Sequence, residues 1–235
     1  MSRFADICKM QILLASATSA EIEISAEWLK KKNYRIGNCE FKTLITGVGL
    51  VPTTFALINH LSSHQPGCII QAGIAGAFDA GVEGRVYVIK EDGFGDWGVI
   101  ENGEFKTVFD LKLLKEDEAP FVGGRLQNPN YSLLELSSLE QASAVSVNEI
   151  TTDNDRIHWI QQNHPRLVES MEGAAFHYVC LLKEIPFIQF RSVSNLIGQR
   201  DKTKWKMGEA IQNLNHSLIS FLEILSSQHE THFGF

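Results

Sequence analysis

The sequence predicts an α/β protein whose central sheet contains parallel segments. Short apolar runs of strand length alternate with longer segments of helical periodicity along most of the chain. Of the 235 residues, 44% are hydrophobic and 21% are charged, which is an ordinary globular composition. This length suits one large domain or two small ones, and it is enough to bury a substantial core.

In the N-terminal half, apolar runs are separated by helical patterns. The expected elements are a buried strand at MQILLA (10–15), a helix through EIEISAEWLKKK, a helix over 51–64 after FKTLITGVG, a buried strand at GCIIQA (67–72) and a strand at RVYVI (85–89). Together they form the strand–helix alternation that is typical of parallel sheets.

The C-terminal half continues this alternation after a glycine-rich insertion. Residues 92–109 combine glycines with aromatic residues and predict a long loop or hairpin. The elements expected beyond it are a strand at QASAVSV, a short helix at DNDRIHWIQQNH, a strand at RLVES, a helix over 170–183, a strand at PFIQFRSVS (186–194) and an amphipathic helix over 205–226.

The net charge of −7 disfavours a general nucleic-acid or anionic-membrane surface. No apolar run approaches the length of a membrane span, and the N-terminus lacks an apolar signal core. We therefore expect a cytoplasmic protein with neither nucleic acid nor membrane among its partners.

The cysteines and histidines point to no metal or redox site. The four cysteines are far apart and form no C-x-x-C pair, so buried thiols are expected; they are Cys8, Cys39, Cys68 and Cys180. His60 and His64 could share a helix face, but a solvated face is favoured over a metal site. No metal and no cofactor is expected.

The strand ends carry small residues and a few polar side chains. Ligands of open α/β sheets bind beyond the carboxyl ends of the strands. Those ends are SATSAE (16–21), TGVG (46–49), AGIAG (72–76), VNEIT (147–151), ESMEG (169–173) and SVSN (192–195). They predict a roomy small-molecule pocket with sparse, specific polar groups.

Three polar residues at this rim also have structural interpretations. Glu172 could interact with the dipole of a helix that Ser170 caps. Glu21 could close a capping box with Thr18, and Asn195 could simply turn the chain after its strand. Each interpretation is adequate alone, but none explains why all three residues follow strands.

The sequence also resembles the superfamily of purine nucleoside phosphorylases and methylthioadenosine/S-adenosylhomocysteine nucleosidases, from about Met10 to Ser227. The stretches that carry the resemblance are MQILLASATSAE, ITGVG, QAGIAGAF, VESMEGAA and PFIQFRSVSN. The tail FRSVSNLIGQRD…W looks most like the futalosine hydrolases of that superfamily. The resemblance implies one domain over residues 1–235, with 1–9 as an extension, and a three-layer fold whose mixed, twisted central sheet is flanked by helices.

The resemblance also implies roles in cleaving a ribosyl–purine bond. Glu172 matches the carboxylate that accepts hydrogen bonds from the ribose 2′- and 3′-hydroxyls, and Met171 matches the residue under the sugar. Glu21 matches the residue that positions and deprotonates the attacking water. The purine-flanking wall is matched by the Ala75–Gly76 backbone and by Glu149 and Ile150.

Asn195 stands where relatives that cleave adenine nucleosides have aspartate. Its amide NH2 can donate to a 6-oxo group, and its carbonyl can accept from a protonated N7. With adenine, two donors would face each other and one would stay unpaired. Asn195 therefore favours a 6-oxopurine such as the hypoxanthine of futalosine, whose removal belongs to an alternative menaquinone pathway.

Basic residues separate hydrolysis from phosphorolysis. The related phosphorylases carry arginine after the first strand and after a central strand, whereas here no base precedes Lys30 or Arg85 in those segments. Water is therefore the expected nucleophile. Arg191 and Arg200 are expected to be solvated or structural, although Arg200 could meet an acidic end of the substrate.

Two other functions stay open. The first is a nucleosidase that acts on methylthioadenosine, S-adenosylhomocysteine or inosine-like nucleosides. The second is a non-catalytic nucleoside-binding protein, against which the joint presence of Glu21 and Glu172 weighs. The resemblance further implies a homodimer in which the neighbouring chain closes the 5′ side of the site.

Overall fold

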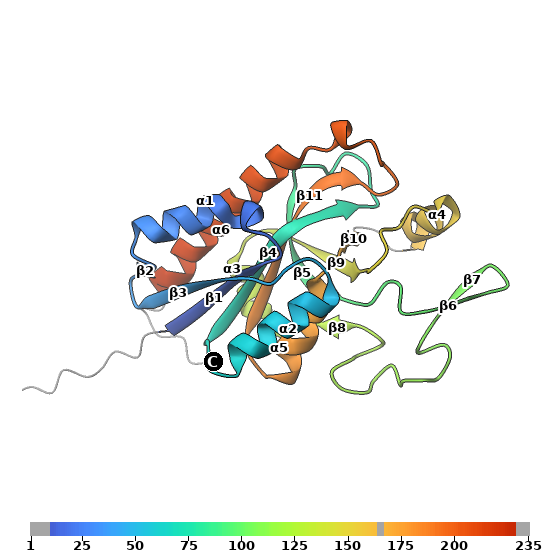
Figure 1. Ribbon diagram of the computed structural model, residues 1–235, viewed down its shortest axis with the longest axis horizontal. Helices are drawn as coiled ribbons and strands as arrows, with labels where there is room; N and C mark the ends of the chain where they lie inside the picture. Colours follow the sequence, from blue (N-terminus) through green and yellow to red (C-terminus); the bar gives the residue numbers. More distant parts are fainter. Residues whose placement is uncertain (1–9, 164–166, 229–235) are drawn as a thin grey trace, which may run out of the picture.

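The computed structural model describes residues 10–163 and 167–228, and it shows a twisted sheet between two layers of helices (Figure 1). The helices are α1 (Ser19–Lys31), α2 (Leu50–Leu61), α3 (Tyr131–Leu136), α4 (Asn154–Asn163), α5 (Gly173–Leu182), the 3₁₀ turn η1 (Lys202–Lys204) and α6 (Met207–Gln228). The strands are β1 (Met10–Ser16), β2 (Arg35–Ile36), β3 (Cys39–Ile45), β4 (Cys68–Ala77), β5 (Val86–Asp92), β6 (Gly98–Glu101), β7 (Glu104–Thr107), β8 (Leu126–Gln127), β9 (Glu140–Ser146), β10 (Leu167–Ser170) and β11 (Phe187–Leu196).

The sheet is mixed, as expected. Within the described residues its order is β10-β9-β5-β11-β4-β1-β3-β2, with β8 beside β5. β1, β3, β4 and β11 run parallel, whereas β5 is antiparallel to β11. β10 also pairs with the end of β4, where Glu169 lies opposite Gly76, so the strands from β4 to β10 close into a ring. This closure brings the ends of β4, β10 and β11 to one place.

Both faces of β1 are buried, which explains its continuous apolar sequence. Ile12 and Leu14 pack into the cluster beneath α6, whereas Leu13 and Ala15 pack into the cluster beneath α2 and α5. Successive side chains of a strand point to opposite faces, so one apolar run serves both layers. In Figure 1, α1 and α6 lie on one side of the sheet and α2 and α5 lie on the other.

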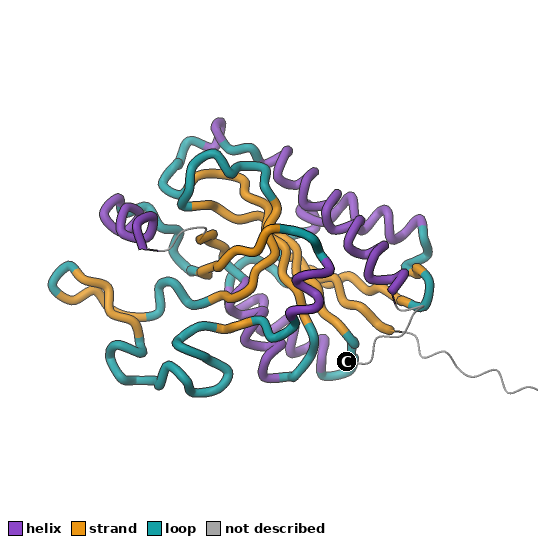
Figure 2. Tube along the Cα trace, turned by 180° about the vertical axis from the view of Figure 1, so that it is seen from behind, coloured by secondary structure: helices purple, strands orange, loops and turns teal. Residues whose placement is uncertain are grey.

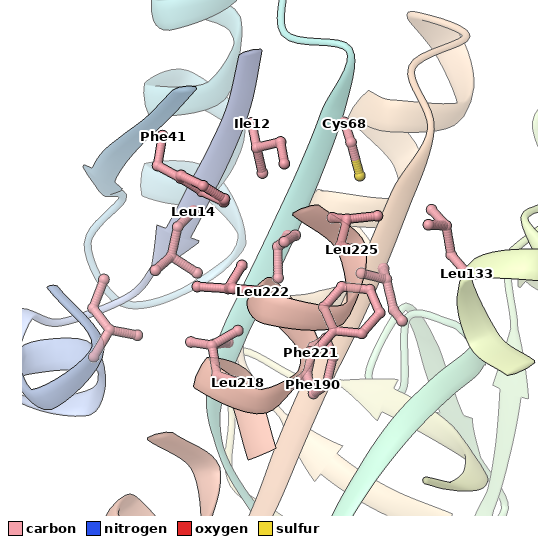
Figure 3. Packing of buried hydrophobic residues seen from close by; sticks show 14 of the residues in the cluster. Ile12, Leu14, Phe41, Cys68, Leu133, Phe190, Leu218, Phe221, Leu222 and Leu225 are labelled. Carbon is pink, nitrogen blue, oxygen red and sulfur yellow. The ribbon is translucent and has the colours of Figure 1, made fainter. Parts of the chain in front are cut away.

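Helix α6 covers the sheet with one apolar stripe (Figure 3). The stripe repeats at helical spacing and consists of Leu214, Leu218, Phe221, Leu222 and Leu225, all buried. The Phe221 ring lies 5.1 Å from the Phe190 ring on β11, measured between centroids. Burying side chains of this size contributes about 1.5–3 kcal/mol each, so the stripe anchors the C-terminal end of the fold.

The glycine-rich insertion contains a hairpin, as predicted. β6 and β7 are joined by Asn102 and Gly103, which have φ values of 54° and 84°. Two positive φ angles are the signature of a type I′ turn, for which Asn-Gly is a preferred pair. Figure 2 shows this hairpin and the loop that follows it projecting from the side of the sheet away from α1 and α6.

Several predicted boundaries differ from the observed ones. β4 continues to Ala77 and β11 to Leu196, because the small residues after each expected strand still pair with neighbouring strands. Helix α5 begins at Gly173, so Ser170 belongs to β10 and the N-cap position is taken by Glu172. The short elements β2, β8 and α3 were not predicted.

The cysteine prediction is confirmed for the three cysteines that the structure describes. Cys39, Cys68 and Cys180 are buried free thiols, and burial raises the pKa of Cys68 to about 12. Cys8 lies outside the described residues. In the part of the chain that the structure covers, no helix has both the length and the apolarity to cross a membrane.

Candidate active site

Two buried carboxylates from distant segments lie at the carboxyl ends of β1, β4 and β10. Glu21, in the first turn of α1, is 7% exposed, and Glu172, immediately before α5, is 5% exposed. A buried carboxylate requires hydrogen bonds or an opposite charge to compensate for lost hydration. The partners of each carboxylate therefore define the site.

Glu21 has a capping role and a second contact. Its Oε2 accepts hydrogen bonds from the Thr18 backbone N–H at 2.9 Å, the Thr18 hydroxyl at 2.9 Å and the Ser16 hydroxyl at 3.2 Å. The predicted capping box is thus present. Its Oε1 accepts from the backbone N–H of Ile74, 3.0 Å away on β4. A simple cap does not explain this contact with the central strand.

Glu172 occupies the N-cap position of α5, but in the described structure its side chain makes no hydrogen bond to the helix. Its Oε1 accepts from the backbone N–H of Gly49 at 3.1 Å, and its Oε2 accepts from Arg191 at 3.3 Å. The carboxylate is therefore directed away from α5, toward the strand ends. The interpretation of Glu172 as a simple partner of the helix dipole does not account for this geometry.

Arg191 is the site residue that the sequence interpretation missed. It is 1% exposed, so of the two expected roles, solvated or structural, the solvated one is wrong. Its guanidinium donates to Glu172, to the Ile74 carbonyl at 3.3 Å and to the Gln71 side chain at 3.2 Å. A charged residue within the apolar strand pattern FIQFRSVS was the available signal, since a buried arginine must have partners.

Gly73 allows the charged groups to approach. A Cβ at this position would lie 2.5 Å from Arg191 Nη1 and 3.0 Å from Glu21 Oε1, closer than side chains permit. Arg191 also bonds Glu172, so Gly73 lies close to Glu21 and to the guanidinium that pairs with Glu172. The structure thus places Glu21 and Glu172 near the same part of β4.

Asn195 lies at a bulge in β11, opposite Gly76 on β4. Its amide nitrogen donates to the Leu196 carbonyl at 3.1 Å, and its carbonyl oxygen accepts from the Ser194 hydroxyl at 2.7 Å. These bonds match the local turn-forming role considered for Asn195. Ala75 and Gly76 are consecutive residues of β4, so this part of the predicted wall lies beside Asn195.

Glu149 and Ile150 belong to an exposed loop after β9. Hydrogen bonds hold this loop at two points. Asp96 accepts from the backbone N–H groups of Asn148 at 2.6 Å and Glu149 at 3.0 Å. Glu169 accepts from the Thr151 backbone N–H at 3.1 Å and from its hydroxyl. Burial raises the pKa of Glu169, and the Thr151 bonds oppose this rise. Because Glu169 lies opposite Gly76, the end of this loop is close to β4.

Met171 lies between Ser170 and Glu172 and is half-buried. A cavity of about 210 Å³ is lined by Leu50, Phe94, Asp96, Trp97 and Asn148. It borders the site because Leu50 follows Gly49, the partner of Glu172. The lining is more aromatic than the predicted small-residue pocket, and Phe94 and Trp97 were not predicted site residues.

The described residues hold no group of three or more metal-ligating side chains with the geometry of a metal site. His60 and His64 stack at 4.4 Å between ring centroids without forming such a group. Arg200 is exposed and lies over the Trp205 ring, 5.9 Å from its centroid. Among the described charged groups, Glu21 and Arg191 lie nearest Gly73, and Arg191 pairs with Glu172.

Comparison with known proteins gives a family match over nearly the whole chain. The family profile described as the phosphorylase superfamily matches residues 10–227. A 5′-methylthioadenosine/S-adenosylhomocysteine nucleosidase of Tolumonas auensis is 24% identical over 235 residues, covering 92% of this chain and 100% of that protein. A futalosine hydrolase of Thermus thermophilus is 25% identical over 177 residues, covering 74% of this chain and 77% of that protein.

Solved structures share the fold at low identity. The futalosine hydrolase of Helicobacter pylori superposes with a TM-score of 0.73 at 15% identity, over 92% of this chain and 98% of that chain. A nucleosidase from Neisseria meningitidis in complex with methylthio-immucillin-A gives a TM-score of 0.72 at 18% identity, over 91% and 98%. The predicted nucleoside phosphorylase-like fold is confirmed, and the named relatives divide between two substrates.

Proposed function

This chain belongs to the phosphorylase superfamily, and from that premise we propose that it hydrolyses the N-glycosidic bond of a 6-oxopurine nucleoside. The expected substrate is futalosine, and the products are hypoxanthine and dehypoxanthine futalosine, in menaquinone biosynthesis. The observation that carries the proposal is the pair of buried carboxylates, Glu21 and Glu172, around the guanidinium of Arg191.

The reaction develops positive charge on the ribose and negative charge on the leaving base. Glu172 is an ionised acceptor held by Gly49 and Arg191, and it accepts hydrogen bonds from the ribose 2′- and 3′-hydroxyls. Its negative charge also stabilises the oxocarbenium-like sugar in the transition state. Met171, the preceding residue, lies against the sugar.

Glu21 is the general base. Its Oε1 bonds only the Ile74 N–H among the described residues, so it retains acceptor capacity for a water molecule. Its Oε2 is held by Thr18 and Ser16, which fixes the orientation of the carboxylate. A fixed base beside the sugar site takes a proton from the water as that water attacks the anomeric carbon.

The partners of Arg191 support water over phosphate as the nucleophile. Both terminal nitrogens of the guanidinium are already engaged by Glu172, Gln71 and the Ile74 carbonyl, and only its buried Nε has no partner among the described residues. Binding phosphate would require breaking the buried ion pair with Glu172, which leaves a costly unpaired charge. Arg191 therefore orients Glu172 in this proposal and binds no phosphate.

Asn195 recognises the purine base through hydrogen bonds. On substrate binding its amide exchanges the Leu196 and Ser194 bonds for O6 and N7 of the base, beside the backbone of Ala75 and Gly76. Glu149 and Ile150 form the other side of the base site, on the loop fastened by Asp96 and Glu169. The cavity lined by Leu50, Phe94 and Trp97 suits the apolar part of a 5′ substituent.

A methylthioadenosine- or S-adenosylhomocysteine-specific nucleosidase is the second candidate, with inosine-type nucleosides also open. It is favoured by the nucleosidase of Tolumonas auensis, whose match covers its full length. A non-catalytic nucleoside-binding protein is the third, and it would leave the arrangement around Glu21 without a purpose.

The homodimer belongs to the same proposal and is supported by the outer face of α2. Val51, Phe55 and Ile58 lie at helical spacing on this face, and Val51 and Phe55 are 75% and 72% exposed. Leu182 at the end of α5 is also exposed beside this layer. An apolar stripe of this kind on a surface helix suits burial against a second copy of the chain. We also propose that the enzyme acts in the cytoplasm.

A base-release assay tests the function. The purified protein is incubated with futalosine, inosine, adenosine and methylthioadenosine, each with and without inorganic phosphate. The proposal expects hypoxanthine from futalosine, free ribosyl product and no effect of phosphate on the rate. Preferential adenine release would favour the second candidate, detection of a sugar 1-phosphate would exclude hydrolysis, and tight binding without turnover would favour the third.

A further inference from the structure

A second group of buried polar side chains lies directly beneath the start of α5. Asp92 ends β5, Ser146 ends β9, and Gln189 lies on β11, and all three side chains are fully buried. None of them has a role in the hydrolysis described above. Burying a polar group costs more free energy than burying an apolar group of similar shape, so a buried polar cluster suggests a role other than packing.

The hydrogen bonds link Asp92 to the first turn of α5. Asp92 Oδ1 accepts from the Gly93 N–H at 2.8 Å and from the Ser146 hydroxyl at 3.1 Å. The Ser146 oxygen in turn accepts from the Ala174 N–H at 2.8 Å. Because the Ser146 hydroxyl donates its proton to Asp92, its oxygen is available to accept a hydrogen bond from the first turn of the helix.

Ser170 contributes a second contact to the same turn. Its hydroxyl lies 3.2 Å from the Ser146 hydroxyl and accepts from the Gly173 N–H at 3.4 Å. Gly173 and Ala174 are the first two residues of α5, whose N–H groups have no partner within the helix. The polar cluster thus satisfies the helix start that the Glu172 side chain does not cap.

The packing against Asp92 is equally close. A Cβ on Gly173 would overlap both Asp92 Oδ2 and Gln189 Nε2. The Gln189 amide also donates to Asp92 Oδ2 at 3.4 Å. The first turn of α5 therefore rests directly on the Asp92 carboxylate, one residue beyond Glu172.

We propose that Asp92 is a positioning residue of the site, whose carboxylate acts through Ser146 to fix the start of α5 and hold Glu172 between Gly49 and Arg191. The inference deepens the proposed function and rests on it. A displacement of about 1 Å in a catalytic group can cost roughly 10²-fold in rate, so a fixed helix start has a direct catalytic consequence.

The test uses two substitutions along the link and one matched control. Ser146→Ala removes the hydroxyl that joins Asp92 to Ala174, and Asp92→Ala removes the carboxylate itself. Ser143→Ala is the control, because Ser143 on the same strand donates to Glu91 at 2.9 Å and, among the described residues, makes no hydrogen bond with α5. Circular dichroism and a thermal melt establish that each variant is folded at the assay temperature.

Each substitution is measured in the wild-type and in the Glu172→Gln background, with futalosine as substrate. A residue that acts through Glu172 loses its effect when Glu172 is already replaced, whereas an independent structural role adds in both backgrounds. We expect Ser146→Ala and Asp92→Ala to lower kcat/KM by roughly 10- to 100-fold in the wild type and by less than about twofold in the Glu172→Gln background. Ser143→Ala is expected to stay within about twofold in both.

Equal losses in the two backgrounds, or no loss in the wild type, would overturn the role of Asp92. If Asp92→Ala does not fold, Ser146→Ala decides the matter alone. A wild type that releases no base would instead remove the proposed function. In that case the amide resonances of Gly173 and Ala174 in a ¹H–¹⁵N spectrum test the positioning role. Ser146→Ala should shift these resonances, and Ser143→Ala should not. Resonances that Ser146→Ala leaves unchanged would refute the positioning role.

Discussion

The first turn of α5 and the length of α6 pack on opposite faces of one sheet, and different kinds of contact hold them there. α6 lies on the sheet through an apolar stripe that includes Leu218 and Phe221 (Figure 3). α5 begins on hydrogen bonds to Ser146 and Ser170. Apolar contact is non-directional, whereas hydrogen bonds weaken steeply with poor geometry. The α6 region therefore supplies stability, and the α5 region supplies the position of a functional group.

The largest expected effect tests whether a substitution in the polar region can abolish catalysis without unfolding the protein. Glu21→Gln should lower kcat by about 10²–10⁴-fold, the usual scale for a general base, with little change in thermal stability. Steady-state kinetics and a thermal melt measure the two effects separately. Glu23→Gln, an exposed residue of the same helix, is the control for the change in charge. Near-normal turnover in a folded Glu21→Gln variant would leave Glu21 with only its capping role.

The apolar region should show the opposite behaviour. Phe221→Ala should lower the free energy of unfolding by about 3–5 kcal/mol, because it leaves a cavity against Phe190. Urea unfolding measures this loss, and Glu223→Ala, on the exposed side of α6, is expected to stay within about 0.5 kcal/mol. The kcat of the fraction that remains folded should be unchanged. A large fall in that kcat would mean that the two regions are not separable.

The buried carboxyl group of Asp92 should make the free energy of unfolding depend on pH. Burial raises the pKa of Asp92 from 3.8 to about 6, opposed by Arg125, by the Gly93 N–H, by Arg191 and by Gln189. His177 lies near the same cluster, and burial lowers its pKa to about 3, so it is neutral. The folded protein thus holds the Asp92 proton more tightly than the unfolded chain does. The corresponding stability is present below about pH 4 and is lost as the pH rises through about 6.

Asp92→Asn cannot titrate and should lose this dependence. Its unfolding free energy relative to wild type should therefore rise by about 3 kcal/mol between about pH 4 and pH 7. Urea unfolding of both proteins across this range provides the measurement. A difference that does not vary with pH would show that Asp92 has the same proton affinity in the folded and unfolded states.

The smallest expected effect concerns base choice within the polar region. The wild type should prefer a 6-oxo over a 6-amino substrate by roughly tenfold to a hundredfold, because the Asn195 amide satisfies O6 and N7 of hypoxanthine and an unpaired donor costs about 1–3 kcal/mol. Asn195→Asp should erode this preference. Matched kcat/KM values for futalosine and its 6-amino analogue test both proteins. A wild type without preference would mean that Asn195 does not read the 6-position.

The sequence predicted the fold through patterns that are local. The apolar run at residues 10–15, the strand at 67–72 and the loop or hairpin at 92–109 all depend on neighbours in the chain, and each is found in the structure. The capping box at Glu21 is local in the same sense. Its further contact with Ile74 was foreseeable only as an expectation that strand ends meet at one edge of the sheet.

Contacts that depend on strand register could not be predicted from the sequence. Arg191 is placed beside Glu172 by the pairing of β11 with β4, and no local pattern specifies that register. The link from Asp92 through Ser146 to Ala174 joins three segments in the same way. The aromatic lining of the cavity was missed because the insertion is placed by tertiary contacts, among them the edge-to-face pair of Phe94 with Tyr178 of α5.

The pairing of β11 with β4 also has a consequence for how the molecule reaches its active form. The bonds that assemble the site join Glu21 to Ile74, Gly49 to Glu172 and Gln71 to Arg191, partners that are 53, 123 and 120 residues apart. Contacts of high sequence separation form late and slow the folding of a chain, because the loop entropy is lost before the contacts are gained. A nascent chain that ends before Phe187 lacks the strand that carries Arg191 to Glu172, so synthesis must be almost complete before the site can exist.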